Sequence, residues 1–412
     1  MIELEQTKER VLLIGVRNSE YDDTEKSLDE LEELVLTAGA ISVGRIIQNR
    51  DKVHPGTYVG KGKVEEIKDL IWETQATGII CDDELTPAQL GNLQDALDTK
   101  IMDRTLIILD IFAARASTNE GKIQVELAQL KYRQSRLVGL GKSLSRLGGG
   151  IGTRGPGEKK LEMDRRLIKD RIAQLNKELI DVKKHREVTR EQRSRNHVPV
   201  VAIVGYTNAG KSTLMNQLTG ADVLEENRLF ATLDPTTRSF QLPSKQEVLF
   251  TDTVGFIRKL PHHLIEAFRS TLEEAKFADI ILHVVDVSSN QVDEQMYIVY
   301  ETLMKLDIIN KPIITVFNKQ DKLTKEQIIK DLKADRTVKL SAKSGDGLEE
   351  LQQVLEDVLR GQKIFIDRIY TYEEAGKIQL IRKYGELLVE DYQPEGIGVK
   401  AYVPLEIYKK VE

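Results

Sequence analysis

Residues 205–212 contain the feature that most constrains the fold of this chain. They read Gly-Tyr-Thr-Asn-Ala-Gly-Lys-Ser and directly follow the apolar run Val200–Val204. The run is typical of a buried parallel strand, and a helix is expected to begin at the end of the motif. In such a strand–loop–helix unit, the glycines let backbone N–H groups turn inward around an anion, and the helix N-terminus adds its dipole. The motif therefore predicts a parallel α/β domain that binds nucleotide phosphates.

A second predicted strand, residues 248–251, ends at Asp252-Thr253-Val254-Gly255. A carboxylate at that strand end can hold Mg²⁺ through water, and the N–H of Gly255 can sense a γ-phosphate. Lys211 is expected to give a positive charge to the terminal phosphates, and the hydroxyl of Ser212 is expected to ligate Mg²⁺. Lys211 and Gly255 are thus candidate catalytic residues, and Thr232, in the switch region between the two motifs, is the third.

A third predicted strand, residues 313–317, ends at Asn318-Lys319-Gln320-Asp321. The carboxylate of Asp321 can accept hydrogen bonds from N1–H and the exocyclic N2 amine of guanine. Adenine has no hydrogen at N1 and no such amine, so this pattern selects GTP over ATP. Ser341-Ala342-Lys343, after the next strand, fits a backbone contact to guanine O6. GTP and GDP, with Mg²⁺, are the expected ligands.

The nucleotide-dependent switch is expected between residues 213 and 251. Three threonines there are candidate Mg²⁺ ligands, and their spacing does not choose among Thr232, Thr236 and Thr237. Phe256 follows Gly255, at the position where many GTPases carry a glutamine that orients the attacking water. A phenylalanine cannot do this, so we expect slow hydrolysis that a partner accelerates. The alternative is that another residue holds the water and the rate is ordinary.

Charge is distributed unevenly along the chain. Residues 115–197 hold 21 lysines and arginines against 10 acidic residues, a net +11, while the rest of the chain carries −17. Apolar residues of this segment recur at heptad spacing, which predicts a helical hairpin with arms near 122–138 and 161–182. Its glycine-rich tip, residues 139–157, is not expected to be helical. A basic hairpin indicates a polyanion partner, although a solvated charged helix has the same composition.

The rest of the chain completes a multidomain α/β architecture. Strand and helix patterns alternate over residues 1–114, which predicts a small parallel α/β domain. We expect the basic helical hairpin over 115–197, a Ras-like G domain with a phosphate-binding loop over 198–361, and a small α+β domain over 362–412. Trp72 and Cys81 are expected in the core of the first domain, and Thr86 is expected to cap a helix that begins at Pro87.

Composition excludes several classes of protein. The chain has 412 residues and a single cysteine, Cys81, so it forms no internal disulfide and no zinc site built from cysteines. No apolar run is long enough to span a membrane, and the N-terminus lacks the apolar core of a signal peptide. We expect a cytoplasmic protein, and a monomer, because the heptad pattern is short enough to be satisfied within the hairpin.

Several motifs together resemble the bacterial HflX-family GTPases over essentially the whole chain. They are PGTYVGKGK at 55–63, GGGIGTRGPGE at 148–158, GYTNAGKS at 205–212, FATLDPT at 230–236 and DTVGFIR at 252–258. The chain departs from the usual GPGETQLE run at Lys159-Lys160. The resemblance implies that Ser212, Thr232 and Asp252 attend Mg²⁺. It also implies that Thr213, Phe230, Ala231, Leu233 and Asp234 join the motifs above at the nucleotide.

The resemblance further implies binding to the large ribosomal subunit and splitting of ribosomes under stress. The hairpin tip is expected to reach ribosomal RNA near the peptidyl transferase centre through Gly148, Gly149, Gly150, Thr153 and Arg154. Two alternatives within this reading are an assembly or quality-control factor that does not split ribosomes and an antibiotic-resistance variant. A third is a signalling GTPase whose hairpin docks on a protein.

Overall fold

The computed structural model describes residues 8–18, 23–144, 156–195, 198–220, 229–230, 233, 236–261, 274–308, 310–323 and 329–412. Contacts group the described residues into two compact units. The N-terminal unit takes residues up to 184, together with 229, 230, 233 and 257–261; the C-terminal unit takes the others. Within the part of the chain that is described, no helix has the length and hydropathy needed to cross a membrane.

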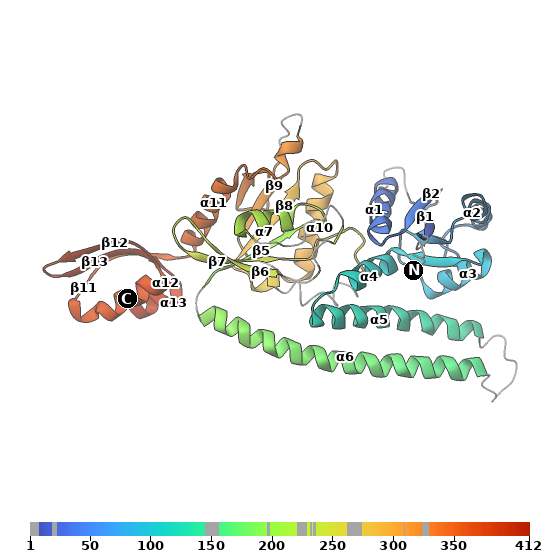
Figure 1. Ribbon diagram of the computed structural model, residues 1–412, viewed down its shortest axis with the longest axis horizontal. Helices are drawn as coiled ribbons and strands as arrows, with labels where there is room; N and C mark the ends of the chain where they lie inside the picture. Colours follow the sequence, from blue (N-terminus) through green and yellow to red (C-terminus); the bar gives the residue numbers. More distant parts are fainter. Residues whose placement is uncertain are drawn as a thin grey trace, which may run out of the picture. The chain divides into compact units, whose positions relative to one another are not determined.

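The N-terminal unit contains a four-stranded parallel sheet with the order β2-β1-β3-β4. Its strands are β1 (Arg10–Arg17), β2 (Ile41–Asn49), β3 (Gly78–Cys81) and β4 (Lys100–Asp103). Helices α1 (Thr24–Thr37) and α4 (Arg104–Arg115) contact each other on one face, and α2 (Lys61–Thr74) and α3 (Pro87–Leu97) contact each other on the other (Figure 1). The parallel α/β prediction for this region is confirmed.

The structure confirms the predictions for Thr86 and Cys81 in this domain and contradicts the one for Trp72. Thr86 caps α3, because its side chain accepts from the backbone N–H of Gln89 while the Gln89 side chain accepts from the N–H of Thr86. Cys81 is buried, as expected. Trp72 is 79% exposed, so its expected core position is wrong. Trp72 comes five residues after the buried Ile67 in α2. At about 100° per residue, this spacing turns its side chain about 140° away from the buried face.

Helices α5 (Asn119–Leu144) and α6 (Pro156–Arg195) run side by side as a hairpin (Figure 1). Ile123, Leu127 and Leu175 are buried between them, with Leu130, Ile172 and Leu179 partly buried alongside. The expected heptad contact is therefore present. The expectation that residues 139–141 and 157 are non-helical is wrong, because α5 continues to Leu144 and α6 begins at Pro156. A single helical glycine costs only about 1 kcal/mol relative to alanine, which the adjoining turns can offset.

The C-terminal unit is built on a six-stranded sheet with the order β10-β9-β8-β5-β7-β6, parallel except for β6 against β7. Its strands are β5 (Val200–Gly205), β6 (Thr236–Gln241), β7 (Glu247–Asp252), β8 (Ile280–Asp286), β9 (Ile313–Asn318) and β10 (Arg336–Lys339). Helices α7 (Lys211–Thr219) and α11 (Leu348–Gly361) share one apolar core, and α10 (Val292–Lys305) packs in another. Because β5, β7 and β9 are parallel, the predicted motifs at their carboxyl ends lie along one edge of the sheet.

The chain ends in an antiparallel sheet with the order β11-β13-β12. Its elements are β11 (Ile364–Tyr370), η2 (Tyr372–Glu374), α12 (Ala375–Tyr384), β12 (Glu386–Gln393), β13 (Gly396–Val403) and α13 (Leu405–Val411). The two helices pack on the apolar residues of one face. This agrees with the predicted α+β region, although the sequence did not predict α13.

Candidate functional site

The loop of residues 206–210 connects the buried strand β5 to α7. Gly210 stands at the N-cap of α7 with φ +94°, a conformation that favours glycine. A Cβ at Gly210 would lie 2.3 Å from Nδ2 of Asn318, so a larger residue there would have to displace the Asn318 side chain. Asn318 in turn donates from Nδ2 to the carbonyl of Ala209 (2.9 Å) and accepts at Oδ1 from the N–H of Ala342 (2.9 Å). The loop is thus fixed to the strand end that carries the base-recognition motif.

Lys211 is the first residue of α7, and its side chain is buried. Its Nζ donates to the carbonyl of Tyr206 at 2.8 Å, which holds the ammonium inside the loop. Burial lowers the pKa of Lys211 to about 8, although the nearby carboxylate of Asp252 opposes the shift. Phosphate oxygens inside the loop would restore the preference for the charged form. The geometry therefore suits a lysine that neutralises phosphate.

Ser212 and Asp252 bring hard oxygen ligands together beside the loop. Oγ of Ser212 donates to Oδ2 of Asp252 at 2.9 Å, and the Asp252 side chain is fully buried at the end of β7. A hydroxyl and a carboxylate next to a phosphate loop are the oxygen donors that Mg²⁺ prefers. The residues present fit this ion.

Gly255 lies against the same loop. A Cβ at this position would be 2.8 Å from Cγ2 of Thr207 and 3.0 Å from Nζ of Lys211. The N–H of Thr207 donates to the carbonyl of Phe256 (2.8 Å), and the N–H of Phe256 donates to the carbonyl of Gly205 (3.1 Å). The Phe256 side chain is buried, so it contributes packing and no polar group to the site.

The base-recognition end is also ordered by hydrogen bonds. Oδ1 of Asp321, an exposed residue, accepts from Oγ of Ser341 at 2.7 Å. This hydrogen bond holds the pKa of Asp321 below its usual value, so the carboxylate is ionised at neutral pH. Nζ of Lys319 donates to the carbonyl of Asn208 (2.7 Å) and to Oδ2 of Asp286 (2.7 Å). The arrangement leaves a rigid, charged acceptor at the position expected for guanine.

The structure thus brings most of the predicted nucleotide residues to one edge of the sheet. Those along this edge are Gly205, Tyr206, Thr207, Asn208, Ala209, Gly210, Lys211, Ser212, Thr213, Asp252, Thr253, Val254, Gly255, Asn318, Lys319, Gln320, Asp321, Ser341, Ala342 and Lys343. Phe230 and Leu233 are buried in the N-terminal unit. Ala231, Thr232, Asp234, Gly148, Gly149, Gly150, Thr153 and Arg154 lie outside the described residues.

The two other candidate switch threonines belong to β6. Oγ1 of Thr237 lies 3.0 Å from Oγ1 of Thr251, and Thr236 is in register with Asp252 across β6 and β7. Sequence reasoning also overlooked Asp286, which orients Lys319. A carboxylate at the end of the apolar run 280–285 was the available signal, because it places an acid at the same sheet edge as the motifs.

The chain is similar to known GTP-binding proteins. Three family profiles match successive parts of the chain: "GTP-binding GTPase N-terminal" at 25–113, "GTP-binding GTPase Middle Region" at 115–193 and "50S ribosome-binding GTPase" at 200–319. A crystal structure of a GTP-binding protein from Sulfolobus solfataricus in complex with GDP is 25% identical, with a TM-score of 0.44, over 84% of this chain and 98% of that one.

Curated relatives match over nearly the whole length. The GTPase HflX of Caldanaerobacter subterraneus subsp. tengcongensis is 50% identical over 100% of this chain and 95% of its own. That of Lacrimispora saccharolytica is 67% identical over 99% of this chain and 96% of its own. The protein is therefore a guanine-nucleotide-binding GTP hydrolase, and its G domain is of the ribosome-binding type. Together with the motifs at 55–63 and 148–158, these relatives show that the chain belongs to the HflX family of GTPases.

Proposed function

We propose that this GTPase binds the large ribosomal subunit and splits stalled or idle ribosomes into subunits under stress. The observation that carries the proposal is the combination, in one chain, of an ordered guanine-nucleotide site and a hairpin segment with a net charge of +11. The ribosome-binding family profile over the G domain supports it. The division into an N-terminal domain (1–114), hairpin (115–197), G domain (198–361) and C-terminal domain (362–412) is part of this proposal.

In the proposed nucleotide complex, backbone N–H groups of the loop bind the phosphates and Lys211 neutralises their charge. Ser212, Asp252 and Thr232 would hold Mg²⁺, which when bound supplies positive charge at the phosphates. The lack of room for a Cβ at Gly255, beside Thr207 and Lys211, supports its role as the residue whose N–H detects the γ-phosphate. Asp321 would then accept from the guanine base.

The burial of Phe256 supports slow hydrolysis in the absence of a partner. A buried phenyl ring cannot donate or accept a hydrogen bond to the attacking water. A group that orients this water in many GTPases is therefore missing at that position. We propose that ribosome binding supplies or positions the missing group, so that hydrolysis is coupled to the correct complex.

The hairpin is proposed to contact ribosomal RNA with its tip, through Gly148, Gly149, Gly150, Thr153 and Arg154, near the peptidyl transferase centre. Lysines and arginines on the arm α6, including Arg166, Lys169 and Lys177, are exposed and can approach phosphates. Neutralising RNA phosphates releases counterions, so binding is expected to weaken steeply with salt. GTP would favour the ribosome-competent conformation and hydrolysis would release it, which couples nucleotide state to subunit affinity.

The test is GTP hydrolysis by the full chain with and without purified large subunits, with light scattering of intact ribosomes in parallel. Stimulation together with a GTP-dependent fall in scattering is expected. A matched variant replaces residues 148–157 by a short linker; it should keep GTP binding and lose activity on ribosomes. Stimulation without splitting would replace the proposal by an assembly or quality-control role. Absence of stimulation and RNase-insensitive pulldown would favour a protein partner.

A further inference from the structure

An acidic site lies at the carboxyl edge of the N-terminal sheet, between the neighbouring strands β1 and β3. The connection from β1 leads to β2 on one side, and the chain then crosses to β3 on the other, so this is the point where strand order reverses. Open α/β sheets bind ligands at such a point. Asp82 and Asp83 directly follow β3 there, and Asp82 is 1% exposed.

The cation in this site is a lysine of the same chain. Nζ of Lys259 lies 2.5 Å from Oδ2 of Asp82 and 2.7 Å from Oδ1 of Asp83. Lys259 is four residues after Gly255, and residues 257–261 belong to the same compact unit as the sheet. The neighbouring Arg258 is buried, and its NH1 lies 3.7 Å from Oδ2 of Asp23. The segment that follows the γ-phosphate-sensing glycine is therefore held by the N-terminal domain.

The backbone of Lys259 has an unfavourable conformation in this contact. Its φ of +53° lies in the left-handed region, which is uncommon for a residue with a Cβ. Its side chain is held by the two carboxylates.

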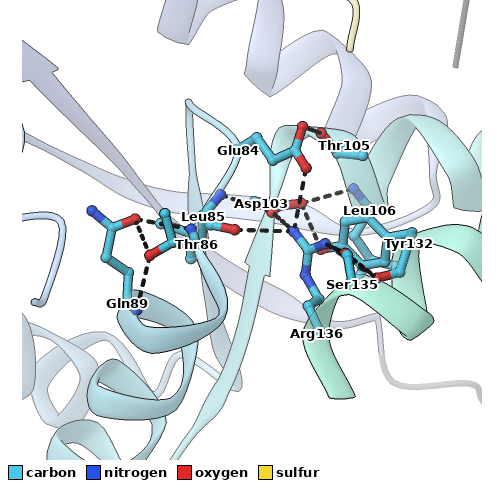
Figure 2. Close-up of polar contacts among 10 residues, drawn as sticks. All are labelled: Glu84, Leu85, Thr86, Gln89, Asp103, Thr105, Leu106, Tyr132, Ser135 and Arg136. Atoms are coloured by element: carbon cyan, nitrogen blue, oxygen red, sulfur yellow. Dashed lines mark hydrogen bonds and ion pairs between the residues drawn. The ribbon is translucent and has the colours of Figure 1, made fainter. Parts of the chain in front are cut away.

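Buried polar contacts continue from Asp82 to the hairpin. NH1 of Arg104 donates to Oδ1 of Asp82 at 2.8 Å, and Arg104 is 1% exposed. Asp103, which precedes Arg104 in the chain, is fully buried. The two carboxylate oxygens of Asp103 accept from the hydroxyl of Tyr132 (2.8 Å) and from NH2 of Arg136 (2.6 Å), as Figure 2 shows. Tyr132 and Arg136 belong to α5, the first arm of the hairpin.

Asp103 also fixes the ends of two other elements. Its Oδ1 accepts from the N–H of Leu106 at the start of α4 (2.9 Å), and its Oδ2 accepts from the N–H of Leu85 before α3 (3.0 Å) (Figure 2). One carboxylate thus fixes α5 relative to the first turn of α4, and the next residue, Arg104, fixes that turn relative to Asp82. Buried hydrogen bonds therefore connect Asp82, through Arg104 and the adjoining Asp103, to α5.

We propose that Lys259 reports nucleotide state to the hairpin. Lys259 lies in the segment after Gly255, so its contact with Asp82 and Asp83 depends on the conformation of that segment. Arg104 and Asp103 link these two carboxylates to α5. In GTPases this segment is one whose order depends on the γ-phosphate. The proposal requires guanine-nucleotide binding and is independent of ribosome binding. By linkage, a contact that senses the nucleotide must also alter the relative affinity for GTP and GDP.

The experiment compares amide hydrogen exchange of α5 in the full chain bound to GDP or to a non-hydrolysable GTP analogue. In the unmodified protein, exchange in residues 119–137 should differ between the two states by about fivefold or more. Lys259→Met should remove most of that difference and change the ratio of GDP to analogue affinity. Lys305→Met, a control on α10 where the lysine pairs with Glu301, should change neither.

A purely structural ion pair would give a different pattern. Lys259→Met would then raise exchange equally in both nucleotide states and leave the difference between them intact, which would overturn the proposal. Asp83→Asn carries the same test if Lys259→Met fails to fold, because it weakens the contact and keeps the shape of the side chain. The double variant should lose no more of the difference than Lys259→Met alone, since both changes act on one contact; a clearly additive loss would also overturn the proposal.

Discussion

Asp321→Asn should exchange the base specificity of the nucleotide site. The aspartate is a charged acceptor whose Oδ1 is held by Ser341 at 2.7 Å, and guanine offers it two donors, N1–H and the N2 amine. An asparagine keeps one acceptor oxygen and turns an NH₂ group toward the second donor. Xanthine has a carbonyl at C2 in place of the amine, so it matches the asparagine and not the aspartate.

The size of the effect follows from the two hydrogen bonds. A hydrogen bond to a charged group is worth about 1.5–3 kcal/mol and a neutral one about 0.5–1.5 kcal/mol, so losing one charged bond and making the other neutral costs about 2.5–4.5 kcal/mol. At about 1.4 kcal/mol for each factor of ten, GDP should bind about 10²- to 10³-fold more weakly to Asp321→Asn. Xanthosine diphosphate should gain affinity over its binding to the unmodified protein.

The assay is displacement of a fluorescent GDP analogue by GDP and by xanthosine diphosphate. Asp357→Asn is the matched control, because Asp357 lies on α11, contacts Arg360 at 3.8 Å and belongs to no nucleotide motif. GDP affinity within about tenfold of the unmodified protein, with no gain for xanthosine diphosphate, would refute the assignment of Asp321 to the base.

Three further changes test other parts of the molecule. Leu175→Ala should destabilise the hairpin by about 3–5 kcal/mol, since this side chain is fully buried between the arms. The control Leu167→Ala, at a position 63% exposed, should cost about 0.5 kcal/mol or less. Equal loss of amide protection in α6 in the two variants would contradict this prediction. Burial lowers the pKa of Lys211 to about 8, and phosphate favours its charged form, so GDP binding should take up a proton above that pH. GDP affinity should then be flat below about pH 8 and fall by up to about tenfold per pH unit above it, and calorimetry in two buffers should detect the proton. Gly255→Ala should slow GTP hydrolysis by about 5- to 150-fold through overpacking against Lys211, whereas Gly62→Ala, which meets nothing within 4 Å, should leave the rate unchanged.

The sequence was most informative where chemistry fixes local spacing. A phosphate must be surrounded by consecutive N–H groups, so Gly205 through Ser212 are contiguous and readable without a structure. The buried parallel strands β7 and β9 appear as largely apolar runs that end in a polar residue, which is why Asp252 and Asn318 could be assigned to one edge. The capping box at Thr86 is equally local.

Contacts between distant segments left no comparable signal. Lys259 and Asp82 are 177 positions apart, and Arg136 and Asp103 are 33 apart. The strand β4 has only four residues, Lys100–Asp103, which is too short to show a period of two. Without it, nothing indicated that Asp103 would be buried at the sheet edge or that Arg136 would pair with it.

The arginines of the hairpin show how pairing changes the meaning of a charge count. Arg171 binds both carboxylate oxygens of Glu126 across the arms (2.7 and 3.0 Å), and NH2 of Arg165 donates to the carbonyl of Leu137. Arg136 is occupied by Asp103. These cations contribute to the net +11 of the segment, but their guanidinium groups are engaged in holding α5 to α6 and to the sheet. The sign of the hairpin's field therefore follows from composition, whereas the surface that a polyanion can contact follows from which cations, such as Lys169 and Lys177 on α6, are exposed.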